Sequence, residues 1–198
     1  MSAMNTIKED IIQLQILQAA QQLFQKHGFQ KVSMDDVAKA IGKGRSSLYY
    51  YYKSKDEIFE AVIDAEIKDI LNEIGRAMEK ADGVGEKIRA FCTAKIRIAR
   101  IRQPFFQALE AGMNADEMSR YAQKKLDFNK RMIKEETALV RQALADGTTA
   151  REGVDTVIFV LLGSLRGLKQ QMFLANDFTH MDAAIDTLTR MTVQELKI

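Results

Sequence analysis

The segment between Val37 and Lys55 carries the side chains best suited to binding chemistry. It holds five basic residues and no acidic one, together with three serines and four consecutive tyrosines. Cations and hydroxyls gathered on one surface are the groups that bind the phosphates of nucleic acids. Arg45 adds a planar fork that can bind guanine O6 and N7 together. The segment therefore predicts a DNA-contacting surface.

The candidate contacts divide by chemistry. Arg45 is the best candidate for reading a base. Weaker candidates for base or sugar contacts are Ser46, Ser47 and Tyr50. Candidates for phosphate contacts are Ser33, Tyr49, Tyr51 and Lys55, and Lys43 completes the set. Each tyrosine could instead pack in the core, which is the role we expect for Tyr52.

Two short helices and a turn must position these side chains. Ser33 can cap a helix whose first turn contains Asp35 and Asp36, where the helix dipole favours anions. Gly42 suits the end of that helix, which needs a left-handed backbone. A second helix is expected from Ser46 or Ser47 to Tyr52. This order is that of a helix-turn-helix, which lays its second helix in the major groove.

At these residues the chain resembles the tetracycline-repressor (TetR) family of bacterial transcription regulators. The matching residues are Ser33, Val37-Ala38, Gly42, Leu48-Tyr49, Tyr52, Ser54-Lys55 and Ile58, with Ala19-Ala20, Leu23-Phe24 and His27-Gly28-Phe29 upstream. The resemblance covers roughly Ile16 to Phe59. Lys43 and Gly44 depart from it, because the family usually has an apolar residue and a serine there.

The resemblance implies an all-α protein with a DNA-binding domain over residues 1–54 and an effector-binding and dimerisation domain over 55–198. It further implies a homodimer that binds double-stranded operator DNA, most often as a repressor that responds to a small molecule. The alternative is a helical protein-interaction module whose helix-turn-helix serves only for packing. No cofactor is expected beyond an unidentified small-molecule effector.

Helical periodicity continues through the rest of the chain, which has 11 Gly and 1 Pro. A long helix is expected to begin near Lys55. Asp82 to Gly85 is expected to form a turn, and the next helix to end at Pro104, since the residue before proline disfavours helix. Residues 105–111 would then form a separate short helix. About nine helices and no strand result, with Glu135-Glu136 on a solvated helix face.

The last two helices carry a possible dimer seam. Its residues are Val154, Ile158, Leu161, Leu165 and Leu168, with Ile185 and Leu188 on the final helix. Spacings that alternate between four and three residues suit a partner helix, and Gly163 with Gly167 permits a close approach. Packing within one chain explains the same pattern equally well. The resemblance favours a four-helix bundle across a two-fold axis.

The resemblance also implies an effector pocket among the central helices. Candidate apolar walls are Phe105, Phe106, Met113, Phe128, Met132, Phe159 and Met172, and Arg97 or Arg166 could orient a polar or anionic end. Most small-molecule sites have apolar walls of this kind. The same side chains at helical spacing could equally be ordinary core.

Composition argues against several other classes of protein. With 2 His and 1 Cys, a zinc site is not expected, and Gly42 to Ser47 lacks the spacing of a nucleotide-binding loop. A lone cysteine forms no internal disulfide and fits a reducing cytoplasm. Residues 1–55 carry 8 basic and 4 acidic side chains, so the basic excess lies at the helix-turn-helix. We expect a cytoplasmic protein without catalytic residues or a membrane span.

Overall fold

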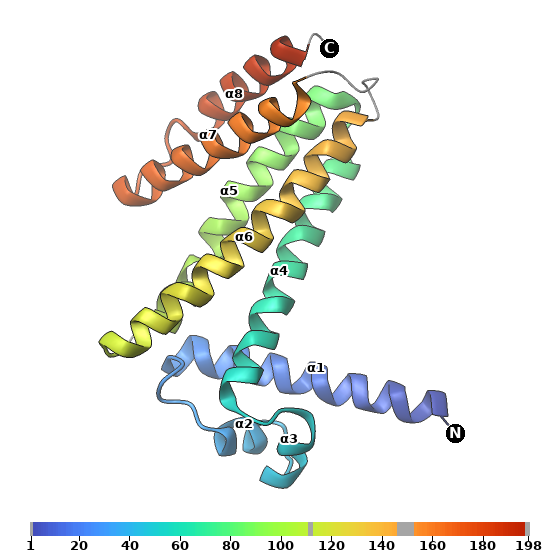
Figure 1. The fold of residues 1–198 in the computed structure, drawn as a ribbon, viewed down its shortest axis with the longest axis vertical. Coiled ribbons are helices and arrows are strands. Elements are labelled where there is room, and N and C mark those ends of the chain that lie inside the picture. The colour runs from blue at the N-terminus through green and yellow to red at the C-terminus, as the bar shows by residue number, and fades with distance from the viewer. Residues whose placement is uncertain (1, 111–112, 146–152, 197–198) are drawn as a thin grey trace. The chain divides into compact units, whose positions relative to one another are not determined.

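A computed structural model describes residues 2–110, 113–145 and 153–196. Within these ranges every regular element is a helix, and there are eight (Figure 1). Their bounds are α1 Ser2–His27, α2 Met34–Ala40, α3 Arg45–Tyr51, α4 Lys55–Glu79, α5 Gly83–Glu110, α6 Ala115–Ala145, α7 Val154–Ala175 and α8 Met181–Leu196. The all-α prediction is confirmed, with eight described helices where about nine were expected.

The count differs because α5 does not stop at its proline. Pro104 lies inside α5, although it removes one backbone hydrogen bond and a proline within a helix costs roughly 3 kcal/mol. The residues that follow offset this cost, since Phe105 and Leu109 are both buried, and burying such a side chain stabilises by about 1.5–3 kcal/mol. The predicted turn at Asp82 to Gly85 is also shorter, because α5 begins at Gly83.

The chain packs as two compact units. The N-terminal unit contains Met1–Lys68 and Arg102–Phe128, and the C-terminal unit contains Asp69–Ile101 and Asn129–Ile198. Helices α4, α5 and α6 each contribute residues to both units. The limits of these units differ from the predicted domain boundary between residues 54 and 55. The division into a DNA-binding domain and an effector-binding domain at that boundary remains a prediction.

Contacts far apart in sequence build the N-terminal unit. The buried carboxylate of Glu66 in α4 accepts a hydrogen bond from Gln21 in α1 and lies 3.6 Å from Nη1 of Arg102 in α5. The rings of Phe59 and Tyr121 meet edge to face at 6.2 Å. The ends of α5 and α6 that belong to this unit therefore support the same core as α1.

Local sequence explains the helix-turn-helix. Ser33 and Asp36 form a reciprocal capping box at the start of α2, because each side chain accepts a hydrogen bond from the other residue's backbone N–H. After α2, Gly42 has φ +65°, and the N–H of Lys43 donates to the carbonyl of Ala38 at 2.9 Å. This left-handed glycine ends the helix as predicted. Helix α3 then begins at Arg45, one or two residues earlier than expected.

In the C-terminal unit α7 and α8 lie side by side (Figure 1). Ile158, Leu161 and Leu165 on α7 are buried together with Ile185 and Leu188 on α8. Among the described residues, only α7 is long and apolar enough to cross a membrane by length and composition. That is a weak indication, because helices in the core of soluble proteins share these features.

Candidate nucleic-acid interface

Helix α3 packs one face against the core and leaves its other face, the outer face of α3, exposed to solvent. Leu48 is completely buried, as are Val37 and Ala38 of α2. Arg45, Ser46, Ser47, Tyr49 and Tyr50 are all exposed. The structure therefore brings the predicted base-reading candidates of α3 together on one open surface, as reading DNA in a groove requires.

Gly44 leaves the start of α3 open. It is the N-cap residue, with φ −76° and ψ 157°, and it has no side chain to accept a hydrogen bond from the first turn. No acidic side chain stands in that turn. A Cβ on Gly44 would approach nothing closer than 4.0 Å, so sterics do not require glycine there. The departure at Gly44 leaves the motif intact.

Arg45 is the most constrained of the exposed candidates. Its Nε lies 3.4 Å from Oδ1 of Asp35, and Nη1 donates to Oδ2 of Asp35 at 3.5 Å. Nη2 donates to the hydroxyl of Tyr49 at 3.2 Å, and the guanidinium lies 5.5 Å from the centre of the Tyr49 ring. Sequence reasoning missed Asp35 as a partner, although its place in the first turn of α2 was recognised.

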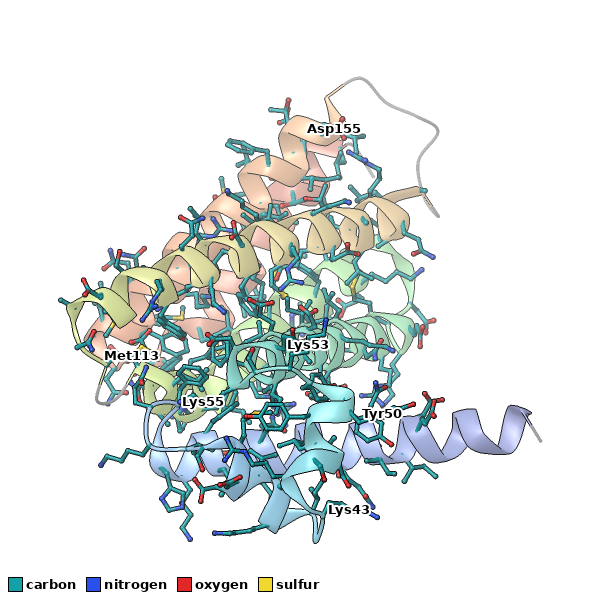
Figure 2. All side chains as sticks on the ribbon, turned by 60° about the horizontal axis from the view of Figure 1, so that its bottom comes forward. Lys43, Tyr50, Lys53, Lys55, Met113 and Asp155 are labelled. Atoms are coloured by element: carbon teal, nitrogen blue, oxygen red, sulfur yellow. The ribbon has the colours of Figure 1, made fainter. Side chains whose placement is uncertain are left out.

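The tyrosines divide by exposure. Tyr50 is 72% exposed and points toward α1, where its hydroxyl donates to Oε1 of Glu9 at 3.4 Å (Figure 2). Its ring meets that of Tyr51 edge to face at 5.0 Å. Tyr51 and Tyr52 are half-buried, and burial raises the pKa of both hydroxyls. Tyr50 and Tyr49 are therefore the two tyrosines of α3 with exposed rings.

A small hollow lies beside these rings. It has a volume of about 220 Å³ and is lined by Ile12, Ile16, Ile41, Lys43, Ser47, Tyr50 and Tyr51. Lys43 lies at the outer edge of the turn between α2 and α3 (Figure 2). The polar candidates thus surround an apolar floor supplied by α1.

Like Tyr49, the predicted phosphate contacts Ser33 and Lys55 already have partners within the chain. The Ser33 hydroxyl donates to Asp36 at 2.6 Å, and the hydrogen bonds from Ser33 hold the pKa of the Asp36 carboxyl below its usual value. The Lys55 ammonium donates to the carbonyls of Phe29 and Gln30. Ser33 is exposed and Lys55 half-buried, and their contacts to DNA remain predictions.

The predicted effector residues do not form one cluster. Phe105, Phe106 and Phe128 meet in the N-terminal unit, with ring centres 5.3 and 5.6 Å apart, and Met113 is half-buried in the same unit. Met132 and Met172 are buried in the C-terminal unit. Arg97 and Arg166 are exposed, and Phe159 is 77% exposed. A ring as open as Phe159 is not part of an enclosed apolar wall.

The C-terminal unit has a different hollow, of about 410 Å³. It is lined by Leu71, Asn72, Gly75, Arg76, Glu79, Glu135 and Leu139, none of which was predicted as a ligand residue. A Cβ on Gly75 would meet nothing within 4 Å, so this glycine leaves the groove open. Both polar and apolar side chains of α4 and α6 line this groove.

Glu136 corrects the expectation of a solvated helix face. Its side chain is 2% exposed and forms an ion pair with Lys95, which is also buried. Burial lowers the pKa of Lys95, against the attraction of Glu136. The apolar pattern of α5 and α6 does not indicate this pair, because sequence patterns assign charged residues to the solvent-exposed face of a helix. Among the described residues no group of acidic, histidine or cysteine side chains could hold a metal ion.

Most of the predicted dimer seam is buried within one chain, and Val154 and Leu168 are half-buried. Ile158, Leu161, Leu165 and Ile185 are each at most 1% exposed. Such side chains have little surface left for a second copy, and their part in a dimer remains a prediction. The large apolar residues exposed on α7 and α8 are Phe159, Val160, Leu174 and Met191. Gly163 and Gly167 are also exposed, and a Cβ on either would meet nothing within 4 Å.

Comparison with known proteins agrees with this geometry. The profile of the family described as bacterial regulatory proteins, tetR family, matches residues 16–62, which include α2 and α3. The chain is 30% identical over 70 residues to the HTH-type transcriptional regulator TtgR of Pseudomonas putida, covering 35% of this chain and 33% of that protein. It is 40% identical over 53 residues to the HTH-type transcriptional regulator EthR of Mycolicibacterium smegmatis, covering 27% and 24%.

These sequence matches span less than half the length of the curated relatives. A solved structure extends the likeness to nearly the whole chain. The fatty acid degradation regulator FadR of Bacillus halodurans superposes with a TM-score of 0.60, at 17% identity, over 91% of this chain and 93% of that chain. At that identity the likeness shows a shared fold.

Proposed function

We propose that this chain, which belongs to the TetR family of bacterial transcriptional regulators, binds operator DNA as a homodimer and acts as a repressor whose DNA binding responds to a small molecule. The observation that carries the proposal is the outer face of α3. There Arg45, Ser46 and Ser47 stand exposed over a buried Leu48, with Lys43 at the adjoining turn. A helix used only for packing has no need of such a surface.

In the proposed complex α3 lies in the major groove. Lys43 and the hydroxyls of α3 contact phosphates and sugars, which fix the register, while Arg45 reads a base. Such a protein acts in the cytoplasm, without cofactor or catalytic step. The alternative, a helical interaction module with a helix-turn-helix that does not bind DNA, would leave Arg45 and the exposed serines without a role.

The proposed homodimer is based on an exposed apolar surface of α7 and α8, which we call the dimer face. Its residues are Phe159, Val160, Gly163, Gly167, Leu174 and Met191. Exposed apolar residues gathered on neighbouring helices mark sites of association. The two exposed glycines allow a second helix to approach closely. A two-fold dimer would also place two copies of α3 on half-sites separated by about 34–36 Å.

Selection of DNA from a random duplex pool by the purified full-length chain tests the proposal. A regulator of this kind should enrich a two-fold symmetric sequence, and its affinity should fall steeply with salt concentration. Enrichment of no sequence would favour the interaction module. Transcription from a promoter that carries the enriched site, with and without the chain, then distinguishes repression from activation.

The effector is tested by reciprocity. A ligand can shift the equilibrium between DNA-binding and non-binding forms only through its different affinity for the two. A compound that releases the repressor must therefore bind the operator complex more weakly than the free chain, by the factor by which it lowers operator affinity. A corepressor must bind the operator complex more tightly, by the factor by which it raises operator affinity. Equal affinities would show that the compound is no effector. Titration calorimetry with and without operator duplex measures both values.

A further inference from the structure

We propose that Asp35 is a positioning residue for DNA recognition: it holds Arg45, together with Tyr49, in the orientation that reads a base. The inference rests on the proposed function. Asp35 lies in α2, whereas Arg45 and Tyr49 lie in α3, so the contact joins the two helices of the motif. We call these three residues the arginine clamp.

The geometry of the arginine clamp fixes the guanidinium on two sides. Nε and Nη1 face the two oxygens of the Asp35 carboxylate at 3.4 and 3.5 Å, and Nη2 donates to Tyr49 at 3.2 Å. The two hydrogen bonds use one N–H each on Nη1 and Nη2, and Nε faces Asp35, so one N–H on each Nη atom is left to approach a base. The Tyr49 ring supports the group through a cation–π contact at 5.5 Å.

Each side chain of the clamp is open to solvent where it would meet DNA. The Arg45 side chain is 63% exposed and that of Asp35 is 45% exposed. An ion pair this exposed contributes little to folding stability. Its effect is to limit the rotamers of a long side chain before binding, which lowers the entropic cost of recognition.

Asp35 is separable from the folding of α2. The capping box is formed by Ser33 and Asp36, so replacing Asp35 keeps the cap, and Asp36 keeps one carboxylate in the first turn of α2. A carboxylate beside the DNA surface also repels phosphates. Asp35 therefore lowers the affinity for DNA of any sequence and increases the discrimination between sequences. Its removal should raise the first and lower the second.

The test compares affinity for the selected operator with affinity for a random duplex of the same length. Fluorescence anisotropy should show that Asp35→Asn raises affinity for the random duplex a few-fold, because one repulsive charge is lost. The ratio of operator to random affinity should fall about 3- to 10-fold. Preference at the single operator position read by Arg45 should weaken, while preferences elsewhere stay unchanged.

Three further variants separate positioning from charge. Asp10→Asn removes one negative charge from an exposed site on α1 and should change both affinities alike. Tyr49→Phe keeps the ring and loses the acceptor, so it should lower the ratio without raising random affinity. In an Arg45→Ala background, Asp35→Asn should no longer change the ratio.

The outcomes are distinct. If the parent enriches no DNA sequence, the proposed function fails and this inference fails with it. If the parent discriminates but Asp35→Asn leaves the ratio unchanged or raises it, only this inference is overturned, and a raised ratio identifies Asp35 as a competitor of DNA. A change in ratio that persists without Arg45 also overturns it. Circular dichroism should show the parent's helix content in every variant.

Discussion

The Nζ atom of Lys55, the first residue of α4, lies 2.9 Å from the carbonyl oxygen of Phe29 and 3.3 Å from that of Gln30. It also sits 4.3 Å from the centre of the Phe29 ring. These contacts tie the start of α4 to the segment that follows α1. Phe29 in turn meets Phe24 and Phe59 edge to face, so Lys55 closes an aromatic cluster.

We expect Lys55→Met to lower the free energy of unfolding by about 1–3 kcal/mol, because the carbonyls of two half-buried residues lose a charged donor. Urea denaturation measures this change. Operator affinity should fall with little change in its salt dependence. Lys53→Met is the matched control, since Lys53 is exposed, and stability should change by less than about 0.5 kcal/mol. A salt slope lower by about one in Lys55→Met, with stability unchanged, would instead establish the predicted phosphate contact.

Arg45→Ala should weaken operator binding by roughly 1–3 kcal/mol and relax the preference at one base position. Lys43→Ala should weaken binding to all sequences alike and reduce the salt slope by about one. Binding of a panel of single-base operator variants at several salt concentrations distinguishes the two roles. Identical profiles for both variants and the parent would remove these residues from the interface.

The next prediction concerns the dimer face on α7 and α8. Light scattering on the parent should give about twice the chain mass of 22.4 kDa. Phe159→Asp should yield a folded monomer, because it places an unpaired charge in an apolar interface and disturbs no buried residue of its own chain. Ile101→Asp is the control, at a residue 65% exposed on α5, and should remain dimeric. A parent that is monomeric at micromolar concentration contradicts the prediction.

The sequence predicted best where local chemistry decides the structure. The Ser33 cap and the left-handed Gly42 follow from short-range rules, and the structure agrees with them. Tertiary packing decided the rest. Helix α5 continues past Pro104 because Phe105 and Leu109 are buried. Leu165, a residue of the predicted dimer seam, is buried in the core of its own chain. Periodicity identifies an apolar face but not the surface that covers it.

The buried ion pair between Lys95 and Glu136 predicts strong non-additivity. Lys95→Met alone should destabilise the chain by about 3–5 kcal/mol, because it leaves a buried carboxylate uncompensated. The double variant Lys95→Met with Glu136→Leu should recover most of that loss. Urea denaturation of the parent, both single variants and the double variant gives the coupling. Additive losses would show that the two charges are solvated independently.

Cys92 predicts a dependence of stability on alkaline pH. The thiol is fully buried, and burial raises its pKa to about 12, whereas an unperturbed thiol has a pKa of about 8.5. Above pH 8.5 the unfolded thiol loses its proton while the folded one keeps it, so the unfolded state binds fewer protons. The contribution to stability is therefore complete below pH 8.5 and is lost as pH rises toward 12.

Between pH 8 and pH 10 the parent should lose about 1–2 kcal/mol of unfolding free energy through this thiol. Cys92→Ala should be less stable at pH 8, by roughly 1 kcal/mol, because a buried group is removed. Its stability should then decline less steeply than that of the parent, and the two curves should converge near pH 10. The charge of Lys95 acts on Cys92, and Lys95 is present in both proteins. The pH dependence of stability that Lys95 contributes therefore largely cancels when the two curves are subtracted. Parallel curves from pH 8 to pH 10 would show that the thiol ionises as readily in the folded chain as in the unfolded one.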